Sequence, residues 1–150
     1  MLDTKRFKGL IDSFHEQLLK TNVVKTEIKL AEDKWSLREI IGHLIDSASN
    51  NHQRFVRLQF GDLLDFPAYD AEEWIRTQNY NIIDWDVLVA LWYNYNCVLL
   101  HIIENTDDIM LQNVWVKGEN TISLEQLIND YYKHLELHME HFSKRRKELP

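Results

Sequence analysis

Hydrophobic side chains recur every three to four positions along most of this chain, which is the spacing of amphipathic helices and not the alternation of β-strands. The pattern predicts four helices, at about residues 4–20, 36–59, 84–105 and 123–147. With only four Gly and two Pro, the chain has little turn chemistry for a many-stranded β fold. We therefore expect an all-α fold and a single domain over residues 1–150.

Two of the four helices begin at recognisable caps. In Ser36-Leu-Arg-Glu39 a serine is followed three residues later by glutamate, the pattern of a capping box in which each side chain bonds the other residue's backbone N–H. Ser123-Leu-Glu-Gln126 repeats this pattern before the last helix. Trp35 and Ile40 flank the first box, where they are placed as a hydrophobic staple.

Residues 61–81 interrupt the helical pattern between the second and third predicted helices. This long connection contains one proline and mixed aromatic and acidic residues, with a short helical turn expected near 71–76. Long loops in small domains are often functional. The aromatic residues Phe66, Tyr69 and Trp74 either roof a cleft or simply cover one end of the bundle. A second irregular segment, holding Trp115 and Gly118, precedes the last helix.

His134 and His138 lie one turn apart on the last predicted helix and therefore leave the same face. Two neutral imidazoles at this spacing can occupy adjacent positions on a divalent metal if a third ligand comes from elsewhere in the fold. Such pairs also occur on ordinary solvent-facing helices. A helical projection places His138 at the edge of the apolar stripe, His134 just outside it and His141 further toward solvent, so His141 is expected on the surface.

His43 is the candidate third ligand. It projects roughly 120° from the centre of the second helix's apolar stripe, on a flank shared with Ser47, Asn50 and Arg54. This flank either faces solvent or looks into a cleft between helices, which is where bundles place metal sites. Arg54 on this flank either binds an anionic substrate group or forms a surface ion pair.

Charge and cysteine content narrow the class of protein further. A net charge of -7 argues against a nucleic-acid partner, and the basic run 144–147 complements the negative end of the last helix. The single cysteine, Cys97, excludes an internal disulfide and lies in the apolar run 87–103, so we expect a buried thiol and not a nucleophile. No signal peptide and no membrane span is recognised, which predicts a cytoplasmic protein with no membrane partner.

The segments 35–46 and 124–138, with Arg54 between them, resemble the two signature regions of the DinB-like superfamily, the damage-inducible and YfiT-type four-helix bundles. The resemblance implies an up-down-down-up bundle whose long connection joins parallel second and third helices. It also implies that His43, His134 and His138 bind one divalent metal, with zinc or nickel expected for an all-imidazole set. A homodimer is expected by the same analogy.

The activity that this resemblance implies is less specific than the fold. Members include transferases that conjugate bacillithiol, mycothiol or glutathione to electrophiles, and proteins proposed as hydrolases. We expect a metal-dependent enzyme that transfers a low-molecular-weight thiol to a small-molecule electrophile. The alternatives are a hydrolase that uses metal-bound hydroxide, and a non-catalytic metal-binding module whose site is closed by a fourth ligand such as His141 or Asp130.

Two acidic residues near the histidines have open roles. Asp46 follows His43 by three residues and Asp130 precedes His134 by four, so each can orient an imidazole or can be a solvated helix residue. No carboxylate is assigned as a general base, which favours thiol transfer over hydrolysis. No residue is assigned a direct catalytic role.

Overall fold

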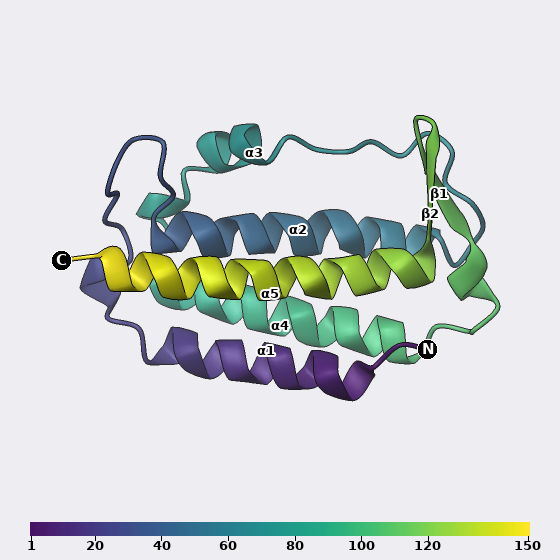
Figure 1. The fold of residues 1–150 in the computed structure, drawn as a ribbon, viewed down its shortest axis with the longest axis horizontal. Coiled ribbons are helices and arrows are strands. Elements are labelled where there is room, and N and C mark those ends of the chain that lie inside the picture. Colours follow the sequence, from purple (N-terminus) through teal and green to yellow (C-terminus); the bar gives the residue numbers. More distant parts are fainter.

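Four long helices lie side by side in the computed structural model, which describes all residues from 1 to 150 (Figure 1). They are α1 (Thr4–Leu19), α2 (Leu37–Arg57), α4 (Trp85–Glu104) and α5 (Leu124–Glu148). A shorter helix, α3 (Ala71–Gln78), occupies the connection between α2 and α4, where the sequence predicts a helical turn. The all-α prediction is confirmed, apart from one small hairpin.

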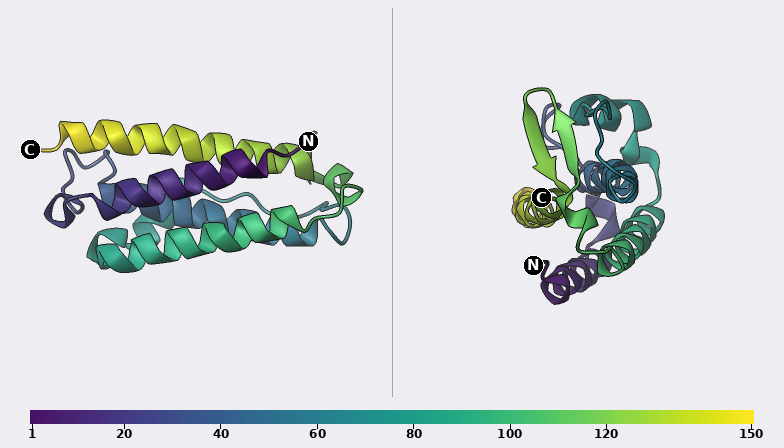
Figure 2. Two further views of the ribbon diagram at one scale, coloured as in Figure 1. Left: turned by 90° about the horizontal axis from the view of Figure 1, so that it is seen from below. Right: turned by 90° about the vertical axis from the view of Figure 1, so that its right-hand side faces the viewer.

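The direction of the helices follows the predicted up-down-down-up order. Helix α1 runs antiparallel to α2, α2 and α4 run in the same direction, and α5 returns in the opposite one (Figure 1). The chain between α2 and α4 therefore crosses the length of the bundle, and α3 lies along its outside (Figure 1). The end-on view shows α2 between α5 and α4, with α1 next to α4 (Figure 2). This arrangement makes α2 and α5 direct neighbours.

The core is one cluster of 31 buried hydrophobic residues. Aromatic rings supply much of it: Phe7 stacks on Tyr132 at 3.8 Å between centroids, and Phe14 meets Trp92 edge-on at 5.1 Å. Trp92 is completely buried, so its truncation to alanine should cost about 3–5 kcal/mol.

Helix α4 is long and apolar enough to span a membrane by length and composition alone. In the bundle, its Trp92 face lies in this core.

Both predicted caps are present, although only one is a complete capping box. The Glu39 backbone N–H donates to Ser36 Oγ at 3.1 Å, and the Ser36 N–H donates to Glu39 Oε2 at 2.8 Å. Ser123 Oγ accepts the Gln126 N–H at 3.1 Å, but the Gln126 side chain makes no bond back to Ser123. The start of α2 is therefore held more firmly than the start of α5.

A β-hairpin that the sequence analysis did not predict occupies the second irregular segment. Strands β1 (Val114–Lys117) and β2 (Asn120–Ser123) pair antiparallel around a two-residue loop. Gly118, with φ +62°, stands first in that loop, as a type II′ turn requires. Leu63 joins β1 through its backbone, accepting from Val116 N–H at 2.8 Å. The hairpin thereby anchors the beginning of the long connection.

The prediction of a buried Cys97 is wrong, because the Cys97 side chain is exposed. Helix α4 is apolar on more than one face: Leu91 and Val98 are also exposed, so composition alone did not identify the inner face. The neighbouring Asn96 is buried instead, and its Oδ1 accepts a hydrogen bond of 2.6 Å from the Tyr131 hydroxyl.

Candidate metal centre

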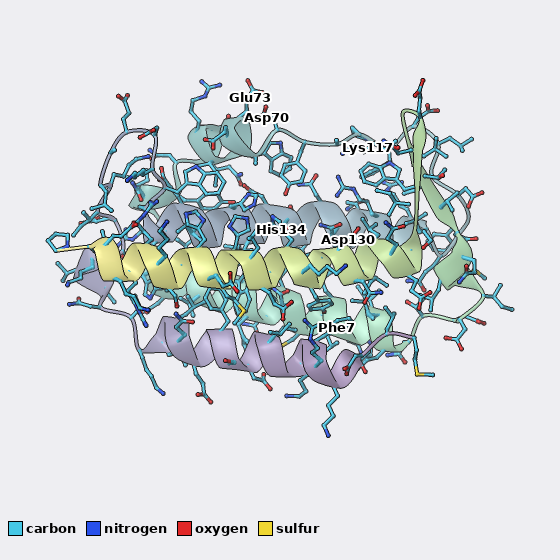
Figure 3. All side chains as sticks on the ribbon, in the orientation of Figure 1. Phe7, Asp70, Glu73, Lys117, Asp130 and His134 are labelled. Atoms are coloured by element: carbon cyan, nitrogen blue, oxygen red, sulfur yellow. The ribbon has the colours of Figure 1, made fainter.

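Three histidines from α2 and α5 meet in the cleft between these helices. His43 is buried, with 5% of its surface exposed, and its Nε2 lies 3.0 Å from His134 Nε2. The His138 ring centroid is 4.5 Å from the ring centroids of both His43 and His134. Figure 3 shows His134 on α5, next to α2. The structure therefore brings together all three residues that the sequence analysis selected as ligands.

The spacing of the three imidazoles fits a shared metal ion. One nitrogen from each ring can be chosen so that all three lie within 4.8 Å of one another. A tetrahedral zinc ion with bonds of about 2.0–2.1 Å holds its ligand atoms about 3.3 Å apart, close to the 3.0 Å that separates His43 from His134. A set made only of imidazoles suits zinc, nickel or copper better than magnesium or calcium, which prefer oxygen.

The protonation of these histidines also favours a metal. Burial lowers the pKa of His43 to about 3, and repulsion by the neighbouring histidines acts in the same direction. Burial likewise lowers the pKa of His138 to about 4 and that of His134 below its usual value. The three rings are therefore neutral at physiological pH and their ring nitrogens can coordinate without competition from protons.

Trp35 forms one wall of the histidine cluster. Its ring centroid lies 4.8 Å from that of His43 and 6.3 Å from that of His138, and its Nε1–H donates to Glu72 at 3.3 Å. The sequence pattern around the cap of α2 predicts only a staple at this position. The Arg145 side chain of α5 donates to the Trp35 carbonyl, and the indole also lies against the histidine ligands.

His141 is half-buried and lies beside His138, with 3.3 Å between their Nδ1 atoms. The prediction of a solvent-facing side chain is therefore wrong in degree. His141 is less exposed than predicted because the Trp35 ring also lies over it, with 6.3 Å between the ring centroids. His141 still does not belong to the set of converging ligands.

Asp46 fits neither of its two predicted roles. It is buried, with 1% exposed, and its Oδ1 accepts hydrogen bonds from the Tyr80 hydroxyl at 2.5 Å and from Gln78 Nε2 at 2.8 Å. Gly42 makes this contact possible, because a side chain there would collide with the Tyr80 ring. The second oxygen of Asp46 and Nδ1 of His43 are both buried without a hydrogen-bond partner, so Asp46 does not orient the imidazole.

Asp130 is a solvated residue of α5. Its side chain is exposed and lies 3.8 Å from the Nζ of Lys133, a partner within the same helix. An exposed pair of this kind contributes little to stability. Asp130 makes no hydrogen bond to a histidine, so of its two predicted roles the solvated one is confirmed.

Arg54 lies further along the same cleft and is buried, with 5% exposed. Its guanidinium lies 4.2 Å from the centroid of the Trp115 ring, and its two hydrogen bonds, to Asn51 Oδ1 and to the Pro67 carbonyl, are both long at 3.4 Å. No carboxylate lies within ion-pair distance, which excludes the predicted surface ion pair. A cation–π contact stabilises by about 0.5–2 kcal/mol, whereas the desolvation of a buried ion costs roughly several kcal/mol. Arg54 is therefore an incompletely compensated charge.

The aromatic residues of the long connection surround Arg54 and not the histidines. The ring centroids of Phe66 and Tyr69 lie 5.9 and 6.0 Å from the guanidinium carbon. Trp74 packs against Tyr69 at 5.2 Å and remains partly exposed. The sequence analysis predicts that these residues cover either a cleft or one end of the bundle. Phe66 and Tyr69 cover the cleft at Arg54.

Comparison with known proteins gives structural relatives only, since no family model and no curated protein matches the sequence. YfiT from Bacillus subtilis, described as a probable metal-dependent hydrolase with an unusual four-helix bundle topology, is similar with a TM-score of 0.82 and 16% identity, over 97% of this chain and 86% of YfiT. A mycothiol-dependent maleylpyruvate isomerase gives 0.72 and 14%, over 92% of this chain and 60% of the isomerase. The DinB-like protein YjoA from Bacillus subtilis gives 0.66 and 16%, over 98% and 94%. The chain therefore has the fold of the DinB-like and YfiT-type four-helix bundles, as its sequence resemblance predicts.

Proposed function

We propose that this protein is a metal-dependent enzyme that transfers a low-molecular-weight thiol to a small electrophile at the site formed by His43, His134 and His138. The observation that carries the proposal is the convergence of three neutral imidazoles without a fourth protein ligand. Structural zinc is usually closed by four protein ligands, whereas a three-ligand set leaves a position for a reactant.

The charge of the ligand set favours a thiolate. A divalent metal bound here supplies a Lewis acid that lowers the pKa of a coordinated thiol or water. His43, His134 and His138 are neutral because burial lowers their pKa values, and no carboxylate joins them, so the ligand set brings no negative charge to offset that of the metal. The positive charge of a bound metal would therefore not be neutralised by its protein ligands, and it would attract an anionic sulfur.

The transfer itself requires few groups from the protein. The thiol gives its proton to solvent and a sulfur–carbon bond forms. The electron pair of the broken bond leaves with the halide of an alkyl halide, or stays on the oxygen of an opened epoxide, which then takes a proton from solvent. The Trp35 ring lies against His43 and shields that side of the ligands, which limits competing hydrolysis, while the open side of the cleft leaves solvent to accept the proton.

Hydrolysis is the second candidate, because YfiT is described as a probable metal-dependent hydrolase. Hydrolysis needs a base that can take a proton from water. The only buried carboxylate near the histidines is Asp46, whose pKa is raised by burial. One of its oxygens is already bonded by Tyr80 and Gln78, and the other is closed off from solvent. The lack of a reachable carboxylate supports thiol transfer over hydrolysis.

Activity with and without added thiol distinguishes the two candidates. The protein is loaded with zinc or nickel and incubated with bacillithiol, mycothiol or glutathione together with an alkyl halide or an epoxide, and the conjugate is measured by mass spectrometry. We expect conjugation to require both metal and thiol. His138→Ala should abolish it, while His101→Ala, which changes an exposed histidine on α4, should not.

The controls separate the remaining possibilities. Cys97→Ser should retain full activity, because Cys97 is exposed on α4 and does not belong to the histidine cluster. Turnover of an ester or amide without thiol would instead support hydrolysis. Conjugation that continues after complete removal of the metal by a chelator would contradict both mechanisms.

A further inference from the structure

Arg54 has hydrogen-bonding capacity that nothing in the protein uses. A guanidinium carries five N–H groups in a planar fork. Two of them make the long bonds to Asn51 and Pro67, and Nε is buried without any partner. The side chain is 5% exposed, and no carboxylate of the protein lies within 4.0 Å of it. A buried arginine without a counter-ion is the arrangement expected where an anion from outside completes the site.

A cavity connects this arginine to the metal centre. It has a volume of about 200 Å³ and lies between α2 and α5. Its lining residues are Ser47, Asn51, Arg54, Tyr69, Leu127, Asp130, Tyr131 and His134. Arg54 is its only cationic residue, and His134 is one of the three candidate metal ligands. A molecule in this cavity can therefore contact the guanidinium at one end and approach the metal centre at the other.

We propose that this cavity binds the carboxylate group of the substrate, with Arg54 as its counter-ion, so that the metal centre acts on small organic monocarboxylates. This inference rests on the proposed function for the identity of the substrate, but the binding of a carboxylate can be measured without any turnover.

The charge of the cavity favours a carboxylate over a phosphate. Asp130 stands at the rim with an exposed side chain, and its own partner is Lys133 at 3.8 Å. The positive charge of Arg54 therefore suits one negative charge and not the two of a phosphate monoester. The guanidinium carbon lies 4.2 Å from the centroid of the Trp115 ring, and the N–H groups left without a strong partner suit the two oxygens of a planar carboxylate.

The geometry also limits the length of the substrate. His43 and Arg54 are eleven residues apart on α2, a rise of about 16 Å. Arg54 Nη1 donates to Asn51, one turn nearer the histidines on α2, which shortens this span. The carboxylate and the reacting atom are thus separated by several bonds. A carboxylate of medium length should fit better than acetate, which cannot reach from Arg54 toward the metal.

The test is calorimetric titration of the 150-residue protein with hexanoate, in both its metal-free and its zinc-loaded form. Hexanol and hexyl phosphate serve as uncharged and doubly charged analogues of the same length. We expect hexanoate to bind both forms, and hexanol and hexyl phosphate to bind at least tenfold more weakly. Arg54→Met should weaken hexanoate binding at least tenfold, and Arg54→Lys by less.

The matched control is Arg57→Met, which removes an exposed arginine one turn further along α2. It should bind hexanoate like the unaltered protein, and circular dichroism with zinc titration should show that Arg54→Met is folded and binds metal. Equal affinity in the Arg54→Met protein would overturn the proposal. So would binding that requires zinc and ignores Arg54, because the carboxylate would then be a metal ligand. A failed thiol-transfer assay alone leaves these results intact and refutes only the proposed reaction.

Discussion

The cleft between α2 and α5 holds buried polar groups at two places, the histidine end and the arginine end. The two ends differ in how the free-energy cost of removing these groups from water is reduced. At the histidine end, burial lowers the pKa of His43 to about 3, so the ring is neutral and carries no uncompensated charge. At the arginine end, burial also lowers the pKa of Arg54, but a guanidinium remains protonated under ordinary conditions. The charge of Arg54 is therefore retained, and only aromatic rings and two long hydrogen bonds offset it.

This difference indicates what each end is suited to bind. Neutral imidazoles are prepared for a cation, whereas a buried and unpaired guanidinium is prepared for an anion. The two ends lie on one flank of α2, so a single molecule can use both. Substitutions at one end of the cleft should therefore leave the binding properties of the other end unchanged.

The largest effect is expected when one ligand of the histidine end is removed. His138→Ala should reduce zinc affinity by more than about 100-fold, beyond the 10–100-fold typical of losing an outer partner of a ligand. His141→Ala should bind zinc with unchanged stoichiometry, because His141 is not among the converging ligands. Calorimetry and metal analysis measure both, and circular dichroism should show helical protein. Full zinc binding by His138→Ala would show that the three histidines are not the site.

Acidification should destabilise the metal-free protein through the same histidines. Unfolded histidines titrate near pH 6.5, whereas the folded pKa is about 3 for His43 and about 4 for His138. Below about pH 6.5 the unfolded chain therefore binds protons that the folded protein does not bind. The contribution of these neutral histidines to the free energy of unfolding is fully present above about pH 6.5 and falls as the pH is lowered toward the folded pKa values. For His43 the loss should be about 2 kcal/mol between pH 7.5 and 5, and His138 should contribute a similar amount, because both folded pKa values lie below pH 5.

Urea unfolding at pH 7.5, 6.5 and 5 measures this loss, which His43→Ala should reduce. The same low pKa values move the competition between protons and metal from pH 6.5, expected for an ordinary histidine, to lower pH. A free energy of unfolding that does not change between pH 7.5 and 5 would contradict the buried, neutral state of the cluster.

Removal of the charge at the arginine end should not destabilise the protein. Arg54→Met keeps most of the side-chain volume and removes a buried charge that has no carboxylate partner. We expect the free energy of unfolding to stay the same or to rise by about 1 kcal/mol, as replacements of buried charges often do. Arg57→Met, on the exposed side of α2, should change it by less than about 0.5 kcal/mol. A loss of about 2 kcal/mol or more in Arg54→Met would show that Arg54 serves the fold.

The smallest effect is expected at Asp46, which lies beside the histidine end without bonding to it. Asp46 accepts from Tyr80 and Gln78 and does not contact a histidine nitrogen within hydrogen-bond distance. Asp46→Asn should therefore change zinc affinity by less than about threefold, in contrast to the 10–100-fold expected when a carboxylate orients a ligand. A loss in that larger range would mean that Asp46 turns to His43 when metal binds.

The sequence was sufficient for the features that depend on local spacing. Hydrophobic periodicity placed the four long helices to within about two residues, and the Ser36 capping box placed the start of α2. Helical geometry selected the pair His134 and His138 and the candidate His43, and the family resemblance joined the three as one ligand set and added the direction of the helices. The hairpin was missed because strands of four residues give too short a pattern to recognise.

Other features depend on how surfaces far apart in sequence meet. Trp35 lies against the histidines in a segment whose backbone is bonded by Arg145 of α5. Cys97 faces outward because α4 is apolar on more than one side. Likewise, Arg54 is next to Trp115 because Leu63 pairs with β1 and brings the hairpin to the end of α2. The sequence alone thus determined the helices and the candidate ligands, since helix formation and capping are local. Only the tertiary structure decided which polar groups lost their water, because burial depends on contacts between segments that are remote along the chain.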